Sequence, residues 1–312
     1  MESIREGLVA TLAEMPIVAP AGSCELWNYA NKYRPRIENA ILDLLPYTPP
    51  EITGSFNDAI RDAVFPGGKR LRPVMTLLGA ELFGGDPDDV LPAAVAVEFV
   101  HTSSLVFDDL PSMDNADTRR GKESLHKKYG DGLATLVAIG YLNASYRLVS
   151  LCPAPNQGCI VRAIEEIVDC IGPAGMVGGQ ALDLSSCGLA PGQSAEFDVV
   201  RNLKTTGLMR LALNLGAIIS GADETGLSRL TEFASLLGDA YQKSDDLLDM
   251  EEDDRHFLVT AELHDGFRFK ALYRDLHETL HRAKELLLTE FEPSRARTCL
   301  LQLVGYIGNR RA

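Results

Sequence analysis

Apolar residues recur at helical spacing along almost the whole chain, and this pattern restricts the fold more than any other feature. Alternating segments between hairpin turns, which would indicate β-strands, are absent from the sequence. No repeat or low-complexity linker divides the chain. We therefore predict an all-α, single-domain helical bundle with essentially no sheet. The expected helices lie around 56–64, 71–83, 131–151, 160–171, 195–219, 226–250 and 267–290, and another runs from Asp86-Pro87 beyond Leu105.

Weak helical signals set the start of the chain apart. We expect residues 1–25 to form an N-terminal arm and residues 26–312 to form the helical domain. The arm shows neither a signal-peptide pattern nor the composition of a transit peptide. No uncharged apolar run approaches the ~20 residues that a membrane-spanning helix needs. The sequence thus predicts a cytoplasmic protein without integral membrane association.

Net charge and cysteine spacing narrow the possible partners. The formal net charge is −14, and such a field repels nucleic acid and anionic membranes. Any site for an anion must therefore be local. The six cysteines contain no CxxC pair, and no histidine has zinc-ligand spacing. We expect neither a zinc site nor a disulfide framework.

The first of two Asp-rich segments reads DDLPSMD at 108–114, at the end of the helix that begins near residue 86. Burying several polar groups on one helix face is costly unless they line a wet or ligand-filled cavity. We therefore expect a site here, and Pro111 should end or kink the helix. The residues that share this face at i, i+3, i+4 and i+7 are His101, Ser104, Leu105 and Asp108.

The second Asp-rich segment reads DDLLD at 245–249 and lies in an uninterrupted helical pattern. Asp245 and Asp249 are four residues apart, so their carboxylates share a face and repel each other. Divalent cations that bridge carboxylates and phosphate oxygens would turn this repulsion into attraction. Mg²⁺ with a diphosphate fits both segments, whereas either segment alone is as compatible with a solvated acidic face.

Two basic clusters stand out in this acidic chain. One reads GGKRLRP at 67–73, and the other reads RRGK at 119–122, five residues after the first Asp-rich segment. Lys and Arg bind phosphate oxygens, and glycines let backbone amides approach an anion. Either cluster alone is typical of a surface loop. Both clusters together with two Asp-rich segments indicate a diphosphate site.

Five motifs in this order make the chain resemble the trans-isoprenyl diphosphate synthases, and within them the short-chain geranylgeranyl and farnesyl diphosphate synthases. The resemblance covers roughly residues 56–250. It implies the isoprenoid-synthase helical bundle around a central active-site cavity, working as a homodimer. The motifs are FPGGKRLRP at 65–73, EFVHTSSLVFDDLPSMDNADTRRGK at 98–122, GGQALDL at 178–184, LKTTGLM at 203–209 and YQKSDDLLD at 241–249.

The resemblance also implies roles for individual residues. The side chains expected to hold isopentenyl diphosphate are Lys69, Arg72, His101 and Arg120. The carboxylates expected to hold an allylic diphosphate through Mg²⁺ are Asp108, Asp114 and Asp245, supported by Asp109 and Asp249. The cations expected to contact that diphosphate directly are Arg119 and Lys204. The polar groups expected along the developing allylic cation are Gln180, Thr205 and Gln242.

This set of residues fits an ionisation-condensation-elimination reaction. Mg²⁺ and cationic side chains neutralise the leaving diphosphate, so that the allylic C–O bond breaks to a carbocation. The double bond of isopentenyl diphosphate then attacks this cation, and a proton leaves. An apolar pocket protects the cation from water. The sequence therefore predicts a Mg²⁺-dependent prenyltransferase.

Product length is expected to depend on the residues beneath the site. Ser103 and Ser104 lie about one turn before Asp108, where a growing chain must pass. Farnesyl-producing members of the family often carry a bulky aromatic residue at one of these positions. Two serines leave the floor open, and this together with the Pro111-Ser112 insertion favours the C20 product, geranylgeranyl diphosphate.

The chain departs from the family pattern in three places. Residues 250–270 are acidic and lack the usual lysine-containing GKD loop, and Lys270 is a poor substitute. Ala138-Ile139 replaces a usual Gly-Asp pair, and Phe107 replaces a common histidine. A noncatalytic or weakly active subunit that modulates an active synthase is therefore a second hypothesis. A class I terpene cyclase, which needs no second diphosphate site, is a third.

Overall fold

The computed structural model describes residues 24–49, 51, 54–186, 194–256 and 265–310, and helices form almost all of its regular structure. Within these helices no side chain is described at 185–186, 194–202, 204, 249–256 and 265–268. Most of the arm expected at 1–25 lies outside the described residues. In chain order the elements are α2 Cys24–Leu44, α3 Phe56–Val64, α4 Leu71–Leu82, α5 Leu91–Asp108, β1 Thr118–Arg119, β2 Lys122–Glu123, α6 Leu125–Tyr129, α7 Asp131–Val149, α8 Gln157–Ile171, α9 Met176–Ser186, α10 Ser194–Ile219, α11 Glu224–His256, α12 Asp265–Glu290 and α13 Arg295–Gly308.

The all-α prediction is confirmed, and the departures from it are local. All seven helices expected by residue range are present, although α11 continues to His256. Part of the segment at 250–270 that the sequence suggests is a loop is therefore helical. A short antiparallel pair, β1 and β2, is the departure from an entirely sheet-free chain.

The predicted start of α5 at Asp86-Pro87 is wrong, because those residues form a turn before the helix. The backbone N–H of Asp88 donates to Asp86 Oδ1 at 2.9 Å, which satisfies the side chain that was expected to cap the helix. The helix begins at Leu91 with a proline in its first turn. An Asp-Pro pair is a start signal for a turn as well as for a helix, and here the turn prevails.

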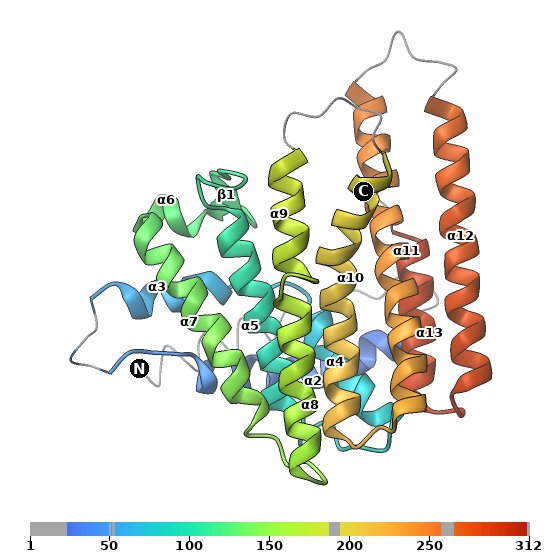
Figure 1. Cartoon of the computed structure of the whole chain (residues 1–312), viewed down its shortest axis with the longest axis horizontal. Helices are drawn as coiled ribbons and strands as arrows, with labels where there is room; N and C mark the ends of the chain where they lie inside the picture. The colour runs from blue at the N-terminus through green and yellow to red at the C-terminus, as the bar shows by residue number, and fades with distance from the viewer. Residues whose placement is uncertain (1–23, 50, 52–53, 187–193, 257–264, 311–312) are drawn as a thin grey trace.

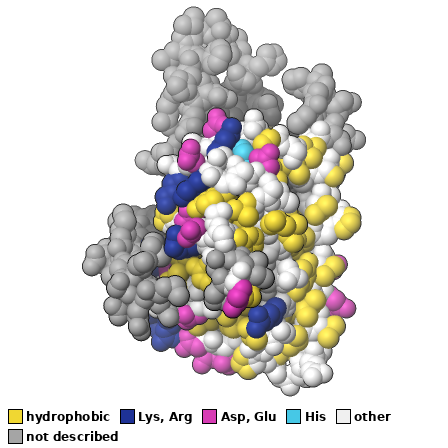
Figure 2. All heavy atoms as spheres, turned by 90° about the vertical axis from the view of Figure 1, so that its left-hand side faces the viewer, with side chains coloured by type: hydrophobic (Ala, Val, Ile, Leu, Met, Phe, Trp, Pro, Cys, Tyr) yellow, Lys and Arg dark blue, Asp and Glu magenta, His cyan; other side chains and the backbone are white. Residues whose placement is uncertain are grey.

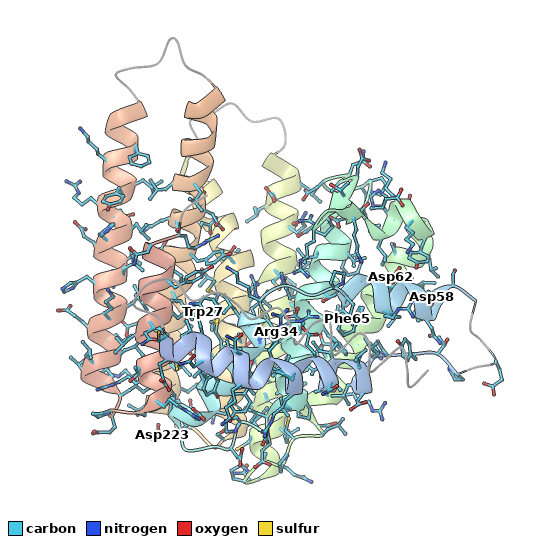
Figure 3. The ribbon with its side chains drawn as sticks, turned by 180° about the vertical axis from the view of Figure 1, so that it is seen from behind. Trp27, Arg34, Asp58, Asp62, Phe65 and Asp223 are labelled. Carbon is cyan, nitrogen blue, oxygen red and sulfur yellow. The ribbon has the colours of Figure 1, made fainter. Side chains whose placement is uncertain are left out.

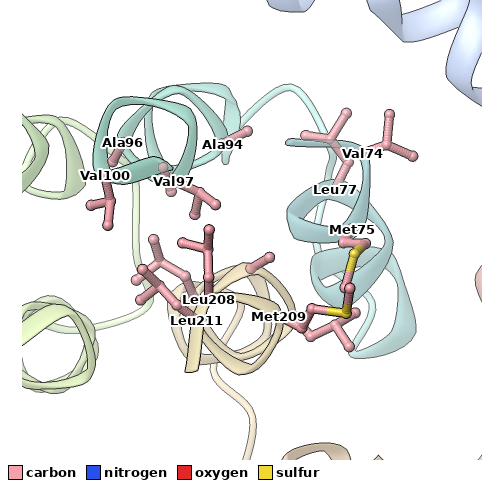
Figure 4. Close-up of a cluster of buried hydrophobic side chains, with 14 of the residues drawn as sticks. Val74, Met75, Leu77, Ala94, Ala96, Val97, Val100, Leu208, Met209 and Leu211 are labelled. Atoms are coloured by element: carbon pink, nitrogen blue, oxygen red, sulfur yellow. The ribbon is translucent and has the colours of Figure 1, made fainter. Parts of the chain in front are cut away.

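Helix α5 lies in the middle of the bundle, in contact with α2, α3, α4, α7 and α10 (Figure 1). Its residues from Ala93 to Val100 are all buried, because apolar side chains surround the helix rather than line one stripe. Figure 4 shows the core where α4, α5 and α10 meet, with Val97 and Val100 of α5 facing Leu208 and Leu211 of α10. The central helix thus carries the first Asp-rich segment on a rigid support.

Two glycines set the close approach of α4 and α10. A Cβ atom added at Gly79 would lie 2.2 Å from the carbonyl oxygen of Leu213. One added at Gly216 would lie 2.0 Å from the carbonyl oxygen of Thr76. Any side chain at these two positions would push the helices apart. This close packing of α4 and α10 fixes the position of Arg72, near the start of α4, relative to Thr205 on α10.

Candidate active site

The first Asp-rich segment folds back on the end of α5. This helix ends at Asp108, three residues before Pro111, which was expected to end or kink it. The N–H of Asp114 donates to the Asp108 carbonyl oxygen at 2.9 Å. Asp109 is buried and faces β1, where Arg119 Nε donates to its two carboxylate oxygens at 2.9 and 3.2 Å. Hydrogen bonding to Asp109, together with the charges of Asp108 and Asp114, raises the pKa of Arg119 above its ordinary value. The structure therefore brings these three carboxylates and Arg119 together.

Arg119 lies in strand β1, whereas its neighbour Arg120 lies in the tight hairpin turn that follows. Arg119 pairs with Lys122 across β1 and β2, whereas Arg120 and Gly121 form the turn with φ of 53° and 74°. Positive φ at both central residues is the geometry of a type I′ turn, which matches the twist of the strands. Arg120 consequently leaves Asp109 and approaches the basic loop, where its guanidinium carbon would lie 3.9 Å from a Cβ atom added at Gly68.

The basic segment at 67–73, which runs from the loop before α4 into its first turn, contains three cations with three different roles. Arg70 is fully buried and binds Glu38 and Glu98, so it holds the loop rather than a ligand. Gly67 makes room for this, because a Cβ atom there would lie 1.9 Å from the Arg70 guanidinium carbon. Lys69 donates to the Tyr306 hydroxyl at 2.9 Å, and Arg72 lies beside His101. Sequence reasoning assigned no role to the two glutamates or to Tyr306.

Arg72 and Arg120 form a crowded pair of cations. Burial lowers the pKa of Arg72, and the charge of Arg120 lowers it further. Burial likewise lowers the pKa of Arg120, with contributions from Arg70 and Arg119. Among the described residues, Arg72 Nε is buried without a hydrogen-bond partner. The partly buried Arg72 and the exposed Arg120, whose charge acts on it, offer a local site for an anion in a chain of net charge −14.

His101 is a neutral acceptor within this cationic site. Burial and the charge of Arg72 lower its pKa to about 3. Arg72 Nη1 lies 3.4 Å from His101 Nε2, and an arginine has only donors. The uncharged ring therefore accepts at Nε2 and carries its proton on Nδ1.

We expect acid to destabilise the protein partly through His101. Its folded pKa of about 3 lies below the unfolded value of 6.5, so the unfolded chain binds a proton that the folded chain does not. The free energy of unfolding from this residue should fall as the pH drops from about 6.5 toward about 3. In His101→Gln the fall in Tm between about pH 7.5 and pH 5 should be smaller than in the original protein. His277→Gln on exposed α12 should keep the full fall, and an equal fall in His101→Gln would contradict the expectation.

A largely apolar cavity of about 550 Å³ opens beside these groups, between α5, α9 and α10. Arg72, His101 and Asp108 contribute to its lining together with apolar side chains. Gln180 and Thr205 also line it, and Gln180 Oε1 is buried without a hydrogen-bond partner among the described residues. A charged group at one wall and an apolar body are what a molecule with a diphosphate head and a hydrocarbon tail needs. The apolar part of the lining includes Leu142, Ile171, Met176, Val177, Leu184 and Leu208.

The two serines expected beneath the site both line this cavity. Ser103 is buried and donates to the carbonyl oxygen of Ala138 on α7 at 2.9 Å. Ser104 donates to the carbonyl oxygen of His101 within α5 at 2.9 Å. Each hydroxyl is therefore satisfied by backbone, and neither presents a free polar group to a hydrocarbon.

The second Asp-rich segment lies on α11, and the side chains of Asp245 and Asp246 are described. Arg310, just beyond α13, forms an ion pair with Asp245 at 2.7 Å and lies over the Tyr241 ring at 4.2 Å. Gln242 is half-buried on the same helix. The side chains of Asp249 and Lys204 lie outside the described residues, so their expected roles stay predictions. Arg310 is a further cation that sequence reasoning missed.

The carboxylates of the site are suited to a Mg²⁺ ion that is bound jointly by the protein and by the phosphate oxygens of a substrate. Among residues 24–310 as far as they are described, no three His, Cys, Asp or Glu side chains converge closely enough to hold an ion by themselves. Mg²⁺ prefers one or two carboxylates together with waters and phosphate oxygens over a cage made of protein alone. Asp108, Asp114 and Asp245 are acceptor-only oxygens of the type that this ion takes. No helix of the described residues is long and apolar enough to cross a membrane.

Comparisons with known proteins agree with this geometry. The family model described as "Polyprenyl synthetase" matches residues 54–258. A chloroplastic geranylgeranyl pyrophosphate synthase of Catharanthus roseus is 33% identical over 290 residues, covering 90% of this chain and 79% of the relative. The large subunit 1 of a heterodimeric geranylgeranyl pyrophosphate synthase of Arabidopsis thaliana is 33% identical, covering 82% of this chain and 72% of its own. The solved geranylgeranyl pyrophosphate synthetase of the archaeon Geoglobus acetivorans superposes with a TM-score of 0.79 at 25% identity, covering 92% of this chain and all of the other.

Proposed function

The chain belongs to the polyprenyl synthetase family, and from this premise we propose that it condenses isopentenyl diphosphate with an allylic diphosphate to make geranylgeranyl diphosphate. The observation that carries the proposal is Arg72, a partly buried cation at the wall of an apolar cavity that Asp108 also lines, with Arg120 close enough for its charge to lower the pKa of Arg72. One diphosphate fits the cations, and a second fits the carboxylates through Mg²⁺. A class I terpene cyclase would need only the second of these.

The residues of the site divide the work of the reaction. Bound Mg²⁺ would be held by Asp108, Asp114 and Asp245 and would supply charge neutralisation at the leaving diphosphate. Arg119, which donates to Asp109, lies where its positive charge can help neutralise the leaving diphosphate. The allylic C–O bond breaks and diphosphate departs. C4 of isopentenyl diphosphate, through its C3=C4 double bond, forms the new C–C bond and leaves a cation at C3, and loss of a proton from C2 then forms the new double bond. The buried Gln180 oxygen and the Thr205 hydroxyl offer dipoles to the transient cation, while the apolar walls exclude water.

The proposed C20 product rests on the open floor at Ser103 and Ser104. In Ser103→Tyr a phenol ring would replace a small buried side chain that lines the cavity, and would shorten the space for a hydrocarbon. We expect this variant to accumulate the C15 product, measured by chain-length analysis of the reaction products. Ser104→Ala removes a hydroxyl without adding bulk and should keep the original product. If Ser103→Tyr is active and its product is unchanged, the floor is formed elsewhere.

Incubation of the purified protein with Mg²⁺, isopentenyl diphosphate and each of the C5, C10 and C15 allylic diphosphates tests the proposed activity directly. Formation of a C20 product supports it. An inert pure protein that stimulates an active synthase would instead identify the second hypothesis, a modulating subunit. The missing GKD lysine motivates that alternative, and a relative named as a subunit of a heterodimer keeps it relevant. The cytoplasmic location stays a prediction, since the similar plant proteins are named as chloroplastic.

An exposed apolar face supports assembly as a homodimer. Large hydrophobic side chains that are about half exposed gather on this face, part of which is visible in Figure 2. Exposed large hydrophobic side chains gathered on neighbouring helices are typical of a protein interface. Sedimentation velocity tests the dimer, and a monomer at micromolar concentration would contradict it. The side chains of this exposed apolar face are Leu136 and Ile139 on α7, Val161 and Val168 on α8, and Val177, Leu182 and Leu184 on α9.

A further inference from the structure

Two aromatic residues from opposite ends of the described chain contact the ammonium group of Lys69, an otherwise exposed side chain. Lys69 Nζ donates to the Tyr306 hydroxyl at 2.9 Å and lies 5.2 Å from the centre of the Tyr306 ring. It also lies 5.7 Å from the centre of the Trp27 ring. The two rings meet edge to face with centroids 5.2 Å apart. Figure 3 places Trp27 near the beginning of α2, beside α13.

The contacts with Tyr306 and Trp27 orient the Lys69 ammonium group without neutralising its charge. No carboxylate of the described residues forms an ion pair with Lys69, in contrast to Arg70 and Arg119. An ammonium group has three donors, and the Tyr306 hydroxyl accepts from one of them, which leaves two for phosphate oxygens. Contact with aromatic rings stabilises a cation while its positive charge persists. Lys69 is therefore held in place and still able to bind an anion.

The helices that supply the two rings are themselves fixed. Trp27 is only 1% exposed, so its ring cannot turn away from the core. The N–H of Leu26 donates to Gln302 Oε1 at 2.8 Å and joins the start of α2 to α13. The Ser244 hydroxyl donates to the carbonyl oxygen of Ile307 at 3.1 Å and joins the end of α13 to α11, next to Asp245. Tyr306 thus has a defined position relative to both α2 and the second Asp-rich segment.

We propose that Tyr306 and Trp27 are positioning residues for Lys69 in the site for isopentenyl diphosphate. Neither residue needs to contact the substrate. Tyr306 sets the direction of the ammonium group through its hydroxyl, and Trp27 holds the Tyr306 ring in place. The inference rests on the proposed function, since it assigns Lys69 to the diphosphate of the non-allylic substrate. It makes both terminal helices of the described chain parts of the active site.

Tyr306→Phe tests the inference, because it removes the hydroxyl and keeps the ring. We expect the KM for isopentenyl diphosphate to rise by about 2- to 10-fold, the effect of one lost hydrogen bond. The KM for the allylic diphosphate and kcat should stay within about twofold. Tyr29→Phe is a matched control, because Tyr29 is a tyrosine of the same interface and lies under Arg295 of α13 rather than Lys69. It should change neither KM.

A double-mutant cycle with Lys69→Met separates positioning from a structural role. If Tyr306 acts through Lys69, Tyr306→Phe should have no further effect on the KM for isopentenyl diphosphate in the Lys69→Met background. Additive effects, equal changes in both KM values, or an unchanged KM in the single variant would overturn the inference. Calorimetric titration with inorganic pyrophosphate provides a second readout that needs no turnover. Weaker pyrophosphate binding in Tyr306→Phe of an inert protein would uphold the positioning role while refuting the proposed activity, and unchanged binding would refute the positioning role.

Discussion

Arg70→Met is expected to lower the free energy of unfolding by about 3–5 kcal/mol, the cost of leaving buried charges without their partner. The side chains of Arg70, Glu38 and Glu98 are 0%, 2% and 4% exposed. Arg70 Nε and Nη2 donate to the Glu38 carboxylate at 3.0 Å each, and Nη2 also donates to the Val64 carbonyl oxygen at 3.0 Å. Burial alone would lower the pKa of Arg70, but Glu98 and Glu38 reverse this and raise it. Methionine fills similar space and satisfies neither glutamate.

Thermal unfolding measures this prediction, with a fall in Tm on the order of 10 °C. Arg36→Met is the matched control, since Arg36 pairs with Asp88 at the surface with both side chains 50% exposed, and such pairs contribute little. A triple variant in which Arg70, Glu38 and Glu98 all become apolar should recover much of the lost stability. A small effect of Arg70→Met, similar to that of Arg36→Met, would show that the triad is not what holds the basic loop.

The fold could be predicted where helices have a continuous apolar face and could not where tertiary contacts decide. Helix α2 was not among the expected helices, and it contains Pro35, which removes a backbone hydrogen bond and normally argues for a helix boundary. Its stability comes from burying Trp27, Ile37 and Ile41 against distant helices. A local sequence pattern cannot predict these contacts, because the helices that pack against α2 include α5 and α13, which lie far along the chain.

The candidate site could be predicted as a set of residue types but not as a set of partners. Arg70 and Arg72 are two residues apart in one motif, yet the first is buried in an ion-pair triad and the second lies at the cavity wall. The difference arises because Arg70 has φ of 53° just before α4, whereas Arg72 lies within the first helical turn. Spacing rules apply inside a helix and give no direction for a left-handed residue before it. The sequence did not predict roles for Tyr306 on α13 and Arg310 just beyond it, because both lie far along the chain from the basic and Asp-rich motifs.

Asp108→Asn is expected to lower kcat by roughly 10²- to 10³-fold, the usual effect of removing one group that stabilises developing charge. Asparagine keeps the size of the side chain and loses the negative charge that a divalent cation needs. The original protein should melt at a higher temperature with Mg²⁺ and inorganic pyrophosphate than without them, because a ligand that binds the folded state stabilises it. This ligand-induced rise in Tm should be lost or strongly reduced in the variant.

Asp89→Asn provides the control for this prediction, because Asp89 is an exposed carboxylate just before the other end of α5. It should keep both kcat and the ligand-induced rise in Tm. The pair of variants also decides between the two interpretations that the sequence allowed for the Asp-rich segments. On a merely solvated acidic face, Asp108→Asn and Asp89→Asn would behave alike, since removing one exposed charge is as tolerable at either end. In a cation site beside Arg119 and the cavity wall, only the loss at Asp108 removes a ligand, so the two variants must differ in activity and in the response to Mg²⁺.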